Sequence, residues 1–402
     1  MRPDDVTRIM LIDDDELQLE MTAIQLRNAG FSSITIFQDS SAALQQINSS
    51  NEPVSLILLD LNMPGMDGLE FLKRIKDTCF SGSILLISGE DARILEAAVR
   101  LATVYDLNVI GHLNKPIEQV ELDAVLGAWS FVPKTVRKKA ARQSFSAERI
   151  REGLGNGEFF NVYQPKVCLR TKELRSVEAL ARWQHPVAGV VFPDQFISVA
   201  EENGLIDALA ESVLGNALTQ LNLWREQGLQ LSMAVNISME NLVTQSFLRF
   251  VESKLNETGV DPHQLTLEIT ESTLMKDYAL VLDMLTRLRM RHVKLSIDDF
   301  GTGHSSNVQL RDIPFTELKI DRGFVNGAWK NTTQEGIVKA NLQLAKNLSI
   351  ITVAEGVEDL NDWNFLIDAN CDFAQGYFIS RPMAGEKLAD WNAEWKARAA
   401  SL

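Results

Sequence analysis

Short apolar segments that end in acidic, amide or amine side chains recur along the last two-thirds of the chain. Such endings occur seven times in succession, and helical patterns separate most of the segments. Roughly eight strand–helix units in about 250 residues match the size of a (β/α)₈ barrel, whose catalytic groups gather at the carboxyl ends of different strands. The sequence therefore predicts a TIM-like (β/α)₈ barrel with one polar site at its rim.

The predicted strand ends supply a set of side chains rich in oxygen. They are Glu178, Asn236, Glu268, Glu271, Asp298, Asp299, Lys319, Asp321, Glu355, Glu358 and Gln375. Carboxylates at close range repel one another unless a cation neutralises them, and acids with an asparagine suit Mg²⁺ or Mn²⁺. The adjacent pair Asp298–Asp299 could serve two ions, which together can activate water and stabilise a displacement at phosphorus. The pattern indicates a metal site that could support a displacement at phosphorus.

Each of these residues taken alone has an ordinary explanation. Asn236 by itself suits a turn, the Asp298–Asp299 pair a polar loop, and Lys319 a surface lysine lying over the rim. Asp321 and Glu358 suit helix caps as well as a metal site. The metal-site interpretation rests on the recurrence of polar groups at successive strand ends.

The first part of the chain alternates shorter apolar runs with helical patterns. Five runs have the composition of strands, namely RIMLI, SITIF, VSLILL, SILLIS and DLNVIGHL. Alternating strands and helices predict a doubly wound, flavodoxin-like parallel sheet with helices on both faces. The strand ends are followed by Asp13, Asp14, Asp60, Ser88 and Lys115. Because ligands bind outside the carboxyl ends of such strands, we expect these groups to share one crevice and to hold one Mg²⁺.

Composition and charge narrow the classes of partner. The formal net charge is −15, so no broad basic surface is expected and DNA binding is not predicted. Three cysteines that form no CxxC pair suit a reducing cytoplasm better than a zinc site or a disulfide framework. No stretch approaches the ~20 apolar residues that span a bilayer, and the N-terminus lacks a signal-peptide pattern. A cytoplasmic protein without membrane contact is predicted.

Residues 128–146 differ from what surrounds them and are predicted to be a basic linker. Lys134, Arg137, Lys138, Lys139 and Arg142 follow Pro133 with no acid among them. An exposed connector is the first interpretation and an anion-binding patch the alternative. The linker separates a first predicted domain, residues 7–127, from a second, residues 147–400.

The first domain resembles the receiver domain of bacterial response regulators. The segment DLNMPGMDGLEFL, residues 60–72, is similar to the phosphorylation loop of that family. The resemblance implies that Asp60 is the phosphoacceptor, that Asp13 and Asp14 hold Mg²⁺, and that Ser88 and Lys115 respond to the phosphoryl group. A sensor histidine kinase is the implied phosphodonor. His112 departs from the family, which usually has an aromatic residue there, so the sequence does not establish output through an aromatic rotamer switch.

The second domain resembles the EAL family of cyclic di-GMP phosphodiesterases over about residues 147–390. The tripeptide Glu178-Ala179-Leu180 lies within EALARW. Further matching segments are YQPKV, FPDQFISVAEENGLI, NIS, LEITES, DDFGTGHSS, LKIDRGFV, AEGVE and AQGYFISRPM. His304 stands where the DFGTG loop often carries Tyr, a departure that removes no expected ligand. The two resemblances together describe a receiver–EAL response regulator.

The EAL resemblance implies a role for each strand-end residue. The first metal would be held by Glu178, Asn236, Glu268 and Asp298, and the second by Asp298, Asp299 and Glu355. Glu355 or Lys319 would help to activate the attacking water, with Glu178 also counted as catalytic, and Glu271 would brace the DDFGTG loop. The dinucleotide would be contacted by Gln164, Leu180, Arg182 and Gln375. The expected reaction opens cyclic di-GMP to linear pGpG.

Two other functions stay open at this point. One is a cyclic di-GMP-binding effector without catalysis, and the other is an interaction scaffold controlled by phosphorylation. Degenerate members of the family usually lose an acid or the lysine, whereas every expected acid, Asn236 and Lys319 are present here. Catalysis is therefore the main prediction, and a homo-oligomer is the expected assembly.

Overall fold

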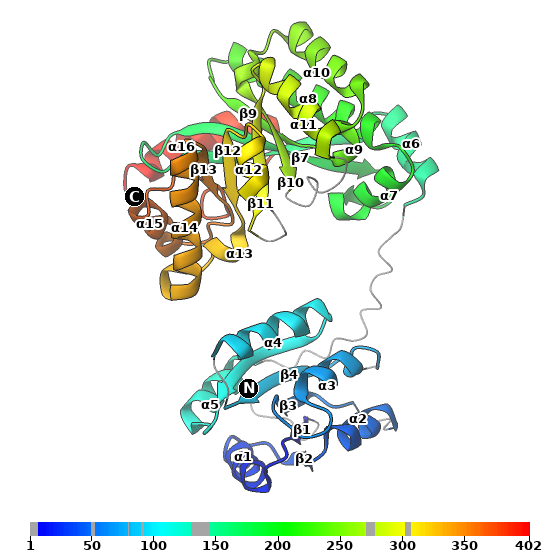
Figure 1. Cartoon of the computed structure of the whole chain (residues 1–402), viewed down its shortest axis with the longest axis vertical. Coiled ribbons are helices and arrows are strands. Elements are labelled where there is room, and N and C mark those ends of the chain that lie inside the picture. The colour runs from blue at the N-terminus through cyan, green and yellow to red at the C-terminus, as the bar shows by residue number, and fades with distance from the viewer. Residues whose placement is uncertain are drawn as a thin grey trace. The chain divides into compact units, whose positions relative to one another are not determined.

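The computed structural model describes residues 7–49, 53–78, 80–89, 92–129, 145–270, 278–301 and 307–402. The chain divides into two compact units, Met1–Ala141 and Arg142–Leu402 (Figure 1). The predicted linker cations Lys134, Arg137, Lys138, Lys139 and Arg142 lie outside the described residues. No helix in the described part of the chain is long and apolar enough to cross a membrane.

The first unit is built on a parallel sheet of five strands. The strands are β1 (Arg8–Ile12), β2 (Ser33–Phe37), β3 (Leu56–Asp60), β4 (Ser83–Ser88) and β5 (Asn108–Asn114). Their order in the sheet is β2-β1-β3-β4-β5, which is the flavodoxin-like doubly wound order. The structure confirms the predicted sheet, and β3 and β4 are buried along their whole length, as their unbroken apolar sequences require.

Helices cover both faces of this sheet. They are α1 (Glu16–Asn28), α2 (Ser40–Ser49), α3 (Gly68–Ile75), α4 (Ala92–Val104) and α5 (Gln119–Ala128). Alternate residues of one strand serve different cores because successive side chains point to opposite faces. Met10 packs in one apolar cluster with Phe71, whereas Leu11 packs in the other with Leu19 and Leu122.

The second unit is a closed barrel. Its strands are β6 (Phe159–Cys168), β7 (Leu174–His185), β9 (Ser232–Asn236), β10 (Leu265–Thr270), β11 (Lys294–Phe300), β12 (Glu317–Ile320), β13 (Ile351–Ala354) and β14 (Phe373–Ala374). The strands β7 and β9 to β14 are parallel neighbours in chain order, and pairing of β6 with both β14 and β7 closes the barrel. This confirms the predicted TIM-like barrel.

Helices surround the barrel (Figure 1). They are α6 (Ala147–Gly155), α7 (Ile197–Glu202), α8 (Ile206–Glu226), α9 (Met239–Leu242), α10 (Gln245–Thr258), α11 (Tyr278–Met290), α12 (Asn307–Asp312), α13 (Arg322–Val325), α14 (Thr332–Leu348), α15 (Leu360–Asp368) and α16 (Leu388–Ala399). Short 3₁₀ turns are η1 (Pro193–Gln195), η2 (Pro262–Gln264), η4 (Ala328–Lys330) and η5 (Gly385–Lys387). One continuous apolar core joins them to the strands.

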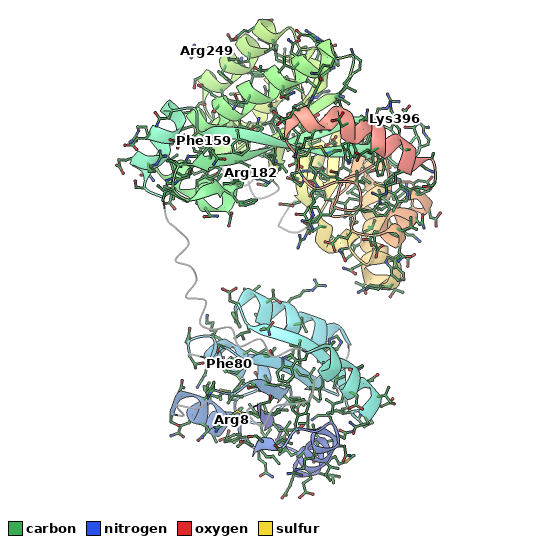
Figure 2. The ribbon with its side chains drawn as sticks, turned by 180° about the vertical axis from the view of Figure 1, so that it is seen from behind. Arg8, Phe80, Phe159, Arg182, Arg249 and Lys396 are labelled. Atoms are coloured by element: carbon green, nitrogen blue, oxygen red, sulfur yellow. The ribbon has the colours of Figure 1, made fainter. Side chains whose placement is uncertain are left out.

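The barrel departs from a simple repeat of strand–helix units at its first strand. Strand β6 runs antiparallel to both of its neighbours, and only a short turn connects it to β7. The short strand β8 (Gly189–Val191) extends this hairpin by pairing with the end of β7. Phe159 and Arg182, labelled in Figure 2, lie on the β6–β7 hairpin. A tight hairpin can join only antiparallel strands, so β6 has no crossover helix.

Candidate active site

The polar residues that end successive strands meet inside the barrel. Glu178, Glu268, Asp298 and Lys319 come from β7, β10, β11 and β12, and each is less than a tenth exposed. Glu268 lies beside Asn236 in the register of β9 with β10, and Thr270 beside Asp298 in that of β10 with β11. Parallel strands bring their carboxyl ends to one rim, so residues far apart in the sequence become neighbours.

Lys319 is the centre of this cluster. Its Nζ lies 2.7 Å from Glu355 Oε1, 2.9 Å from Glu268 Oε2 and 3.1 Å from Asp298 Oδ1. Glu178 Oε1 is 3.8 Å away. The lysine is 1% exposed and therefore does not lie over the rim as a surface side chain. Burial alone would lower the pKa of its ammonium, but the acids Glu178 and Glu268 raise it well above the usual value.

A chain of amides joins Glu178 to residues of neighbouring strands of the barrel. Asn236 Nδ2 donates to Glu178 Oε1 at 2.7 Å, and Gln375 Nε2 donates to Glu178 Oε2 at 2.6 Å. Gln375 Nε2 also donates to Gln164 Oε1 at 3.0 Å, and Gln164 Nε2 donates to the carbonyl of Ser380 at 3.0 Å. Both oxygens of Glu178 are thereby held in one orientation.

Three acids form a group that fits a divalent cation. One oxygen from each of Asp298, Asp299 and Glu355 lies within 4.8 Å of the others. Asp299 has a positive φ of 54°, a conformation rare for a residue with a side chain and often found where function demands it. The donors are all oxygen atoms, which is the ligand chemistry of Mg²⁺ and Mn²⁺.

Crowding of acids changes the protonation of the site. Burial, reinforced by Glu268, raises the pKa of Glu178 to about 7. Burial and the charge of Asp298 raise the pKa of Glu355 to about 8 despite Lys319, and burial with Asp298 raises that of Asp299 to about 6. Glu268 behaves differently, because Lys166 and Lys319 overcome its burial and lower its pKa to about 2. The site therefore holds protons that a bound cation would displace.

Lys166 is a member of the cluster that the sequence interpretation missed. It lies on β6, is 1% exposed, and its Nζ is 2.6 Å from Glu268 Oε1. The signal was present in the segment YQPKV, since Gln164 and Lys166 are two residues apart and share one face of a strand. A lysine on the inward face of a barrel strand needs buried acids as partners.

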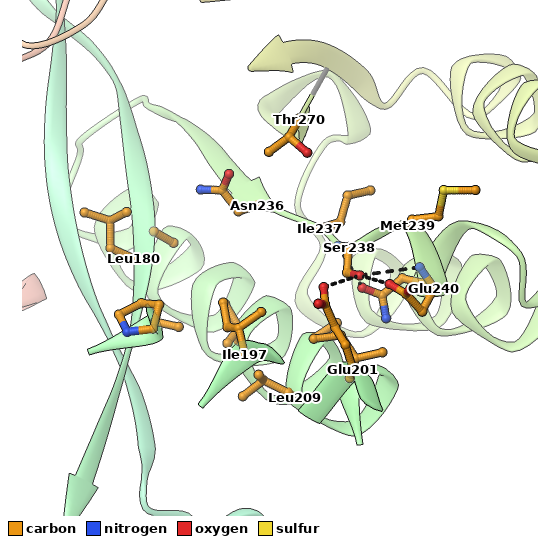
Figure 3. Close-up of a pocket in the computed structure, with 17 residues that line it drawn as sticks. Leu180, Ile197, Glu201, Leu209, Asn236, Ile237, Ser238, Met239, Glu240 and Thr270 are labelled. Atoms are coloured by element: carbon orange, nitrogen blue, oxygen red, sulfur yellow. Dashed lines mark hydrogen bonds between the residues drawn. The ribbon is translucent and has the colours of Figure 1, made fainter. Parts of the chain in front are cut away.

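Two cavities open beside the cluster. One of about 330 Å³ is lined by the acids Glu178, Asp298, Asp299 and Glu355, together with Gln164, Lys319, Gln375, Asp321, Arg322, Glu358 and Tyr377. A second, of about 600 Å³, has a mostly apolar wall that includes Leu180, Pro193 and Ile197 (Figure 3). Asn236 lines the second cavity and binds Glu178 of the first, so the two cavities adjoin. Ser238 donates to Glu201 at 2.8 Å at the polar side of the second cavity.

The structure does not bring every predicted residue to the acids. Arg182 donates to the carbonyl of Ala181 and lies 4.8 Å from the ring centre of Phe192, and it does not line the acidic cavity. Asp321 caps α13 by accepting from Gly323 N at 2.8 Å, although it also lines that cavity with Glu358. The predictions for Glu271 and His304 lie outside the described residues.

The first unit has its own acidic crevice. Lys115 Nζ lies 2.7 Å from Asp13 Oδ2 and 2.9 Å from Asp60 Oδ2. One oxygen from each of Asp13, Asp14 and Asp60 lies within 4.8 Å of the others. Ser88 ends β4, is fully buried, and its carbonyl accepts from Lys115 N at 2.9 Å. Burial raises the pKa of Asp60, although Lys115 opposes the shift. His112 lies on β5 with its side chain exposed.

The fold and the two sites define a receiver domain joined to an EAL domain. The family model described as the EAL domain matches residues 147–382, and that of the response regulator receiver domain matches residues 9–140. The chain belongs to the EAL domain family, and its first unit is a receiver domain, as the sequence predicted.

Particular relatives share both parts or only the barrel. The cyclic di-GMP phosphodiesterase RocR of Pseudomonas aeruginosa is 31% identical over 384 residues, which cover 95% of this chain and 98% of RocR. The bifunctional diguanylate cyclase/cyclic di-GMP phosphodiesterase MucR of the same species is 37% identical over 261 residues, covering 65% of this chain and 38% of MucR. A solved structure of the PaMucR phosphodiesterase in complex with c-di-GMP has a TM-score of 0.57 at 39% identity, covering 60% of this chain and 98% of that chain.

Proposed function

We propose that the chain is a response regulator that hydrolyses cyclic di-GMP to linear pGpG at the rim of its barrel. The observation that carries this proposal is the buried lysine Lys319, which touches acids from three other strand ends in a cavity of about 330 Å³. Similarity to RocR over nearly the whole chain supports the same substrate.

The acids would hold two divalent ions, Mg²⁺ or Mn²⁺. Glu178, Asn236, Glu268 and Asp298 would serve one ion, and Asp298, Asp299 and Glu355 the other. When bound, such ions supply Lewis acidity and a nucleophilic water at neutral pH. Gly356 follows Glu355 with a φ of +65°, and a Cβ there would lie 2.2 Å from Arg322 Cβ, so only glycine fits beside this ligand.

Glu355 is the proposed acceptor of the proton of the attacking water. It belongs to the group of acids proposed to hold a cation, so a water on that cation would lie within its reach, and a positioned carboxylate can act as a general base. Lys319, 2.7 Å from Glu355 Oε1, orients that carboxylate and offsets charge that develops on the phosphoryl oxygens.

The substrate is proposed to contact Gln164, Leu180, Arg182 and Gln375. Gln375 Oε1 is buried and accepts no hydrogen bond within the described residues, so an N–H donor of the substrate would satisfy it. Leu180 lines the apolar cavity of about 600 Å³, whose volume lies within the range of small-molecule sites. Arg182 would have to leave its contact with Phe192 to reach a phosphate.

We expect purified protein to convert cyclic di-GMP to pGpG in the presence of Mg²⁺ or Mn²⁺. Chelation of the metal with EDTA should abolish turnover, because the clustered acids cannot replace a cation at the reacting phosphate. Chromatography of the products measures both effects. Binding of cyclic di-GMP without pGpG formation under any metal would contradict catalysis and favour the effector alternative.

Phosphorylation of Asp60 is proposed to control this activity. Asp60 lies at the end of β3 with Lys115 2.9 Å away, and a sensor histidine kinase is the proposed source of the phosphoryl group. Asp13 and Asp14 would hold the Mg²⁺ that receiver chemistry needs, and Ser88 and Lys115 would contact the acyl phosphate.

Replacement of Asp60 by Ala is expected to remove the change in turnover that a small phosphodonor causes in the wild type. Basal hydrolysis should stay within about twofold, because Asp60 belongs to the receiver unit and not to the barrel. The measurement is the rate of pGpG formation with and without acetyl phosphate. An unaltered response in the variant would separate the receiver from regulation.

A further inference from the structure

The barrel interior contains a column of alternating charges in place of the usual apolar layers. From the amino ends of the strands towards the rim, the column runs Glu317, Lys166, Glu268, Lys319 and Glu355. The interior of such a barrel is ordinarily filled by bulky branched side chains. Two lysines and a glutamate that are at most 1% exposed therefore require a purpose beyond packing.

Glu268 is held by two lysines from opposite sides. Lys166 Nζ lies 2.6 Å from Oε1, and Lys319 Nζ lies 2.9 Å from Oε2. Lys319 also touches Asp298 and Glu355, so it belongs to the rim. Lys166 approaches from below and touches Glu317 at 3.3 Å instead. Each carboxylate oxygen has two lone pairs, and Lys166 contacts Oε1 and not Oε2.

Lys166 itself does not belong to the acidic cavity. It lines a different cavity of about 450 Å³ together with Ser232, Lys294 and Glu317, the first residues of β9, β11 and β12. Among the described residues, those lining the acidic cavity do not include Lys166. A substrate bound at the rim therefore cannot touch this lysine, and any effect on the reaction must pass through Glu268.

We propose that Lys166 is a positioning residue that fixes the Glu268 carboxylate so that Oε2 is presented to a divalent cation at the rim. The inference rests on the proposed function, because it assigns a task within the same metal site. Without Lys166, Oε1 is released, and the carboxylate can turn to pair with Lys319 through both oxygens. Both oxygens of Glu268 would then accept from Lys319, so fewer of their lone pairs would remain for a cation. Groups that orient metal ligands typically change metal affinity by about 10–100-fold.

Replacement of Lys166 by Met tests this role, since Met fills similar space without a donor. Mn²⁺ binding to the full chain is titrated by calorimetry without cyclic di-GMP, in an Asp13→Ala background that removes a proposed ligand of the receiver site. Binding at the barrel is expected to weaken by about tenfold or more. The kcat should fall by a similar factor while the KM for cyclic di-GMP stays within about twofold, since Lys166 does not reach the substrate. Lys294→Met, which removes a lysine from the same lower cavity, is the matched control and should change neither quantity.

The outcomes separate positioning from other roles. Unchanged Mn²⁺ affinity in a folded Lys166→Met protein would overturn the inference, and so would tighter binding, which would make Lys166 a mere competing charge. If Lys166→Met does not fold, Lys166→Gln keeps a polar group in the column. Its shorter, uncharged side chain should weaken Mn²⁺ binding by about threefold or more, and unchanged affinity would again overturn the inference.

Failure of the proposed function gives a different result. Wild-type protein that binds Mn²⁺ but forms no pGpG would refute the phosphodiesterase while the Mn²⁺ comparison still judges Lys166. If the wild type hydrolyses cyclic di-GMP and the Lys166→Met variant binds Mn²⁺ as tightly as the wild type, only the positioning role is refuted. Wild-type protein that binds no Mn²⁺ would refute the positioning role as well.

Discussion

Replacing Glu178 by Ala is expected to lower the rate of cyclic di-GMP hydrolysis by roughly 10²–10⁴-fold, the range found when a group that acts directly on the transition state is lost. The carboxylate accepts from Asn236 at 2.7 Å and from Gln375 at 2.6 Å. Alanine would therefore remove a proposed metal ligand and free two amides that it orients. The measurement is kcat from chromatographic assay of pGpG at saturating Mn²⁺.

The matched control for this variant is Glu173→Ala. Glu173 precedes β7 and pairs with Arg175 at 2.6 Å, but both side chains are more than half exposed. Exposed pairs contribute roughly 0–1 kcal/mol, so this variant should hydrolyse like the wild type. Circular dichroism and the Tm of both variants show whether the fold is intact. Normal hydrolysis by folded Glu178→Ala protein would refute the proposed metal ligands.

The position of the site could be predicted from the sequence because each of its strand-end residues is marked by the apolar run directly before it. Each acid or amide follows an apolar run, and a parallel barrel sends every such ending to one rim. Glu178, Asp298 and Lys319 were therefore predictable as neighbours without any knowledge of their distances. The same holds for Asp13, Asp60 and Lys115 in the doubly wound unit.

Pairings across the barrel could not be predicted in this way. Lys166 lies within a strand, not at its end, and its partner Glu268 is 102 residues away in the sequence. The reversed direction of β6 places Lys166 below Gln164, where a parallel strand would have placed it above. The antiparallel hairpin is thus the reason that Lys166 could not be predicted as a partner of Glu268. Arg182 lies at the far end of the same hairpin and contacts Phe192. No local sequence pattern fixes the direction of a long side chain, so this contact could not be predicted either.

One helical sequence pattern forms two helices in the structure, for a local physical reason. The pattern over residues 196–227 is that of a continuous helix, yet α7 ends at Glu202 and α8 begins at Ile206. Gly204 between them has a φ of +65°, a left-handed conformation that glycine adopts without strain and that ends a helix. The break matters for the site because both helices line the apolar cavity beside Asn236 (Figure 3).

The metal-free barrel is expected to lose stability as the pH rises from about 5 to about 8. Glu178 and Glu355 have pKa values of about 7 and about 8 in the folded protein, above the ordinary value of 4.5. In this window the folded chain binds more protons than the unfolded chain, so the free energy of unfolding falls with increasing pH. Each titrating group contributes about 1.4 kcal/mol per pH unit. Glu268 has the opposite sign, but its pKa of about 2 confines that effect to lower pH.

Urea unfolding in EDTA at several pH values measures this slope, and the buried tryptophans Trp183, Trp224, Trp363 and Trp395 report on the barrel. Glu355→Gln should make the slope shallower by about 1.4 kcal/mol per pH unit, because glutamine cannot titrate. Saturating Mn²⁺ should flatten the slope in the wild type, since a cation needs the same carboxylates ionised. A free energy of unfolding that rises with pH across this window in the absence of metal would contradict the raised pKa values of Glu178 and Glu355. The sign of the change in unfolding free energy with pH thus tests whether the acids around Lys319 need a cation for neutralisation or are neutralised by the lysines of the protein.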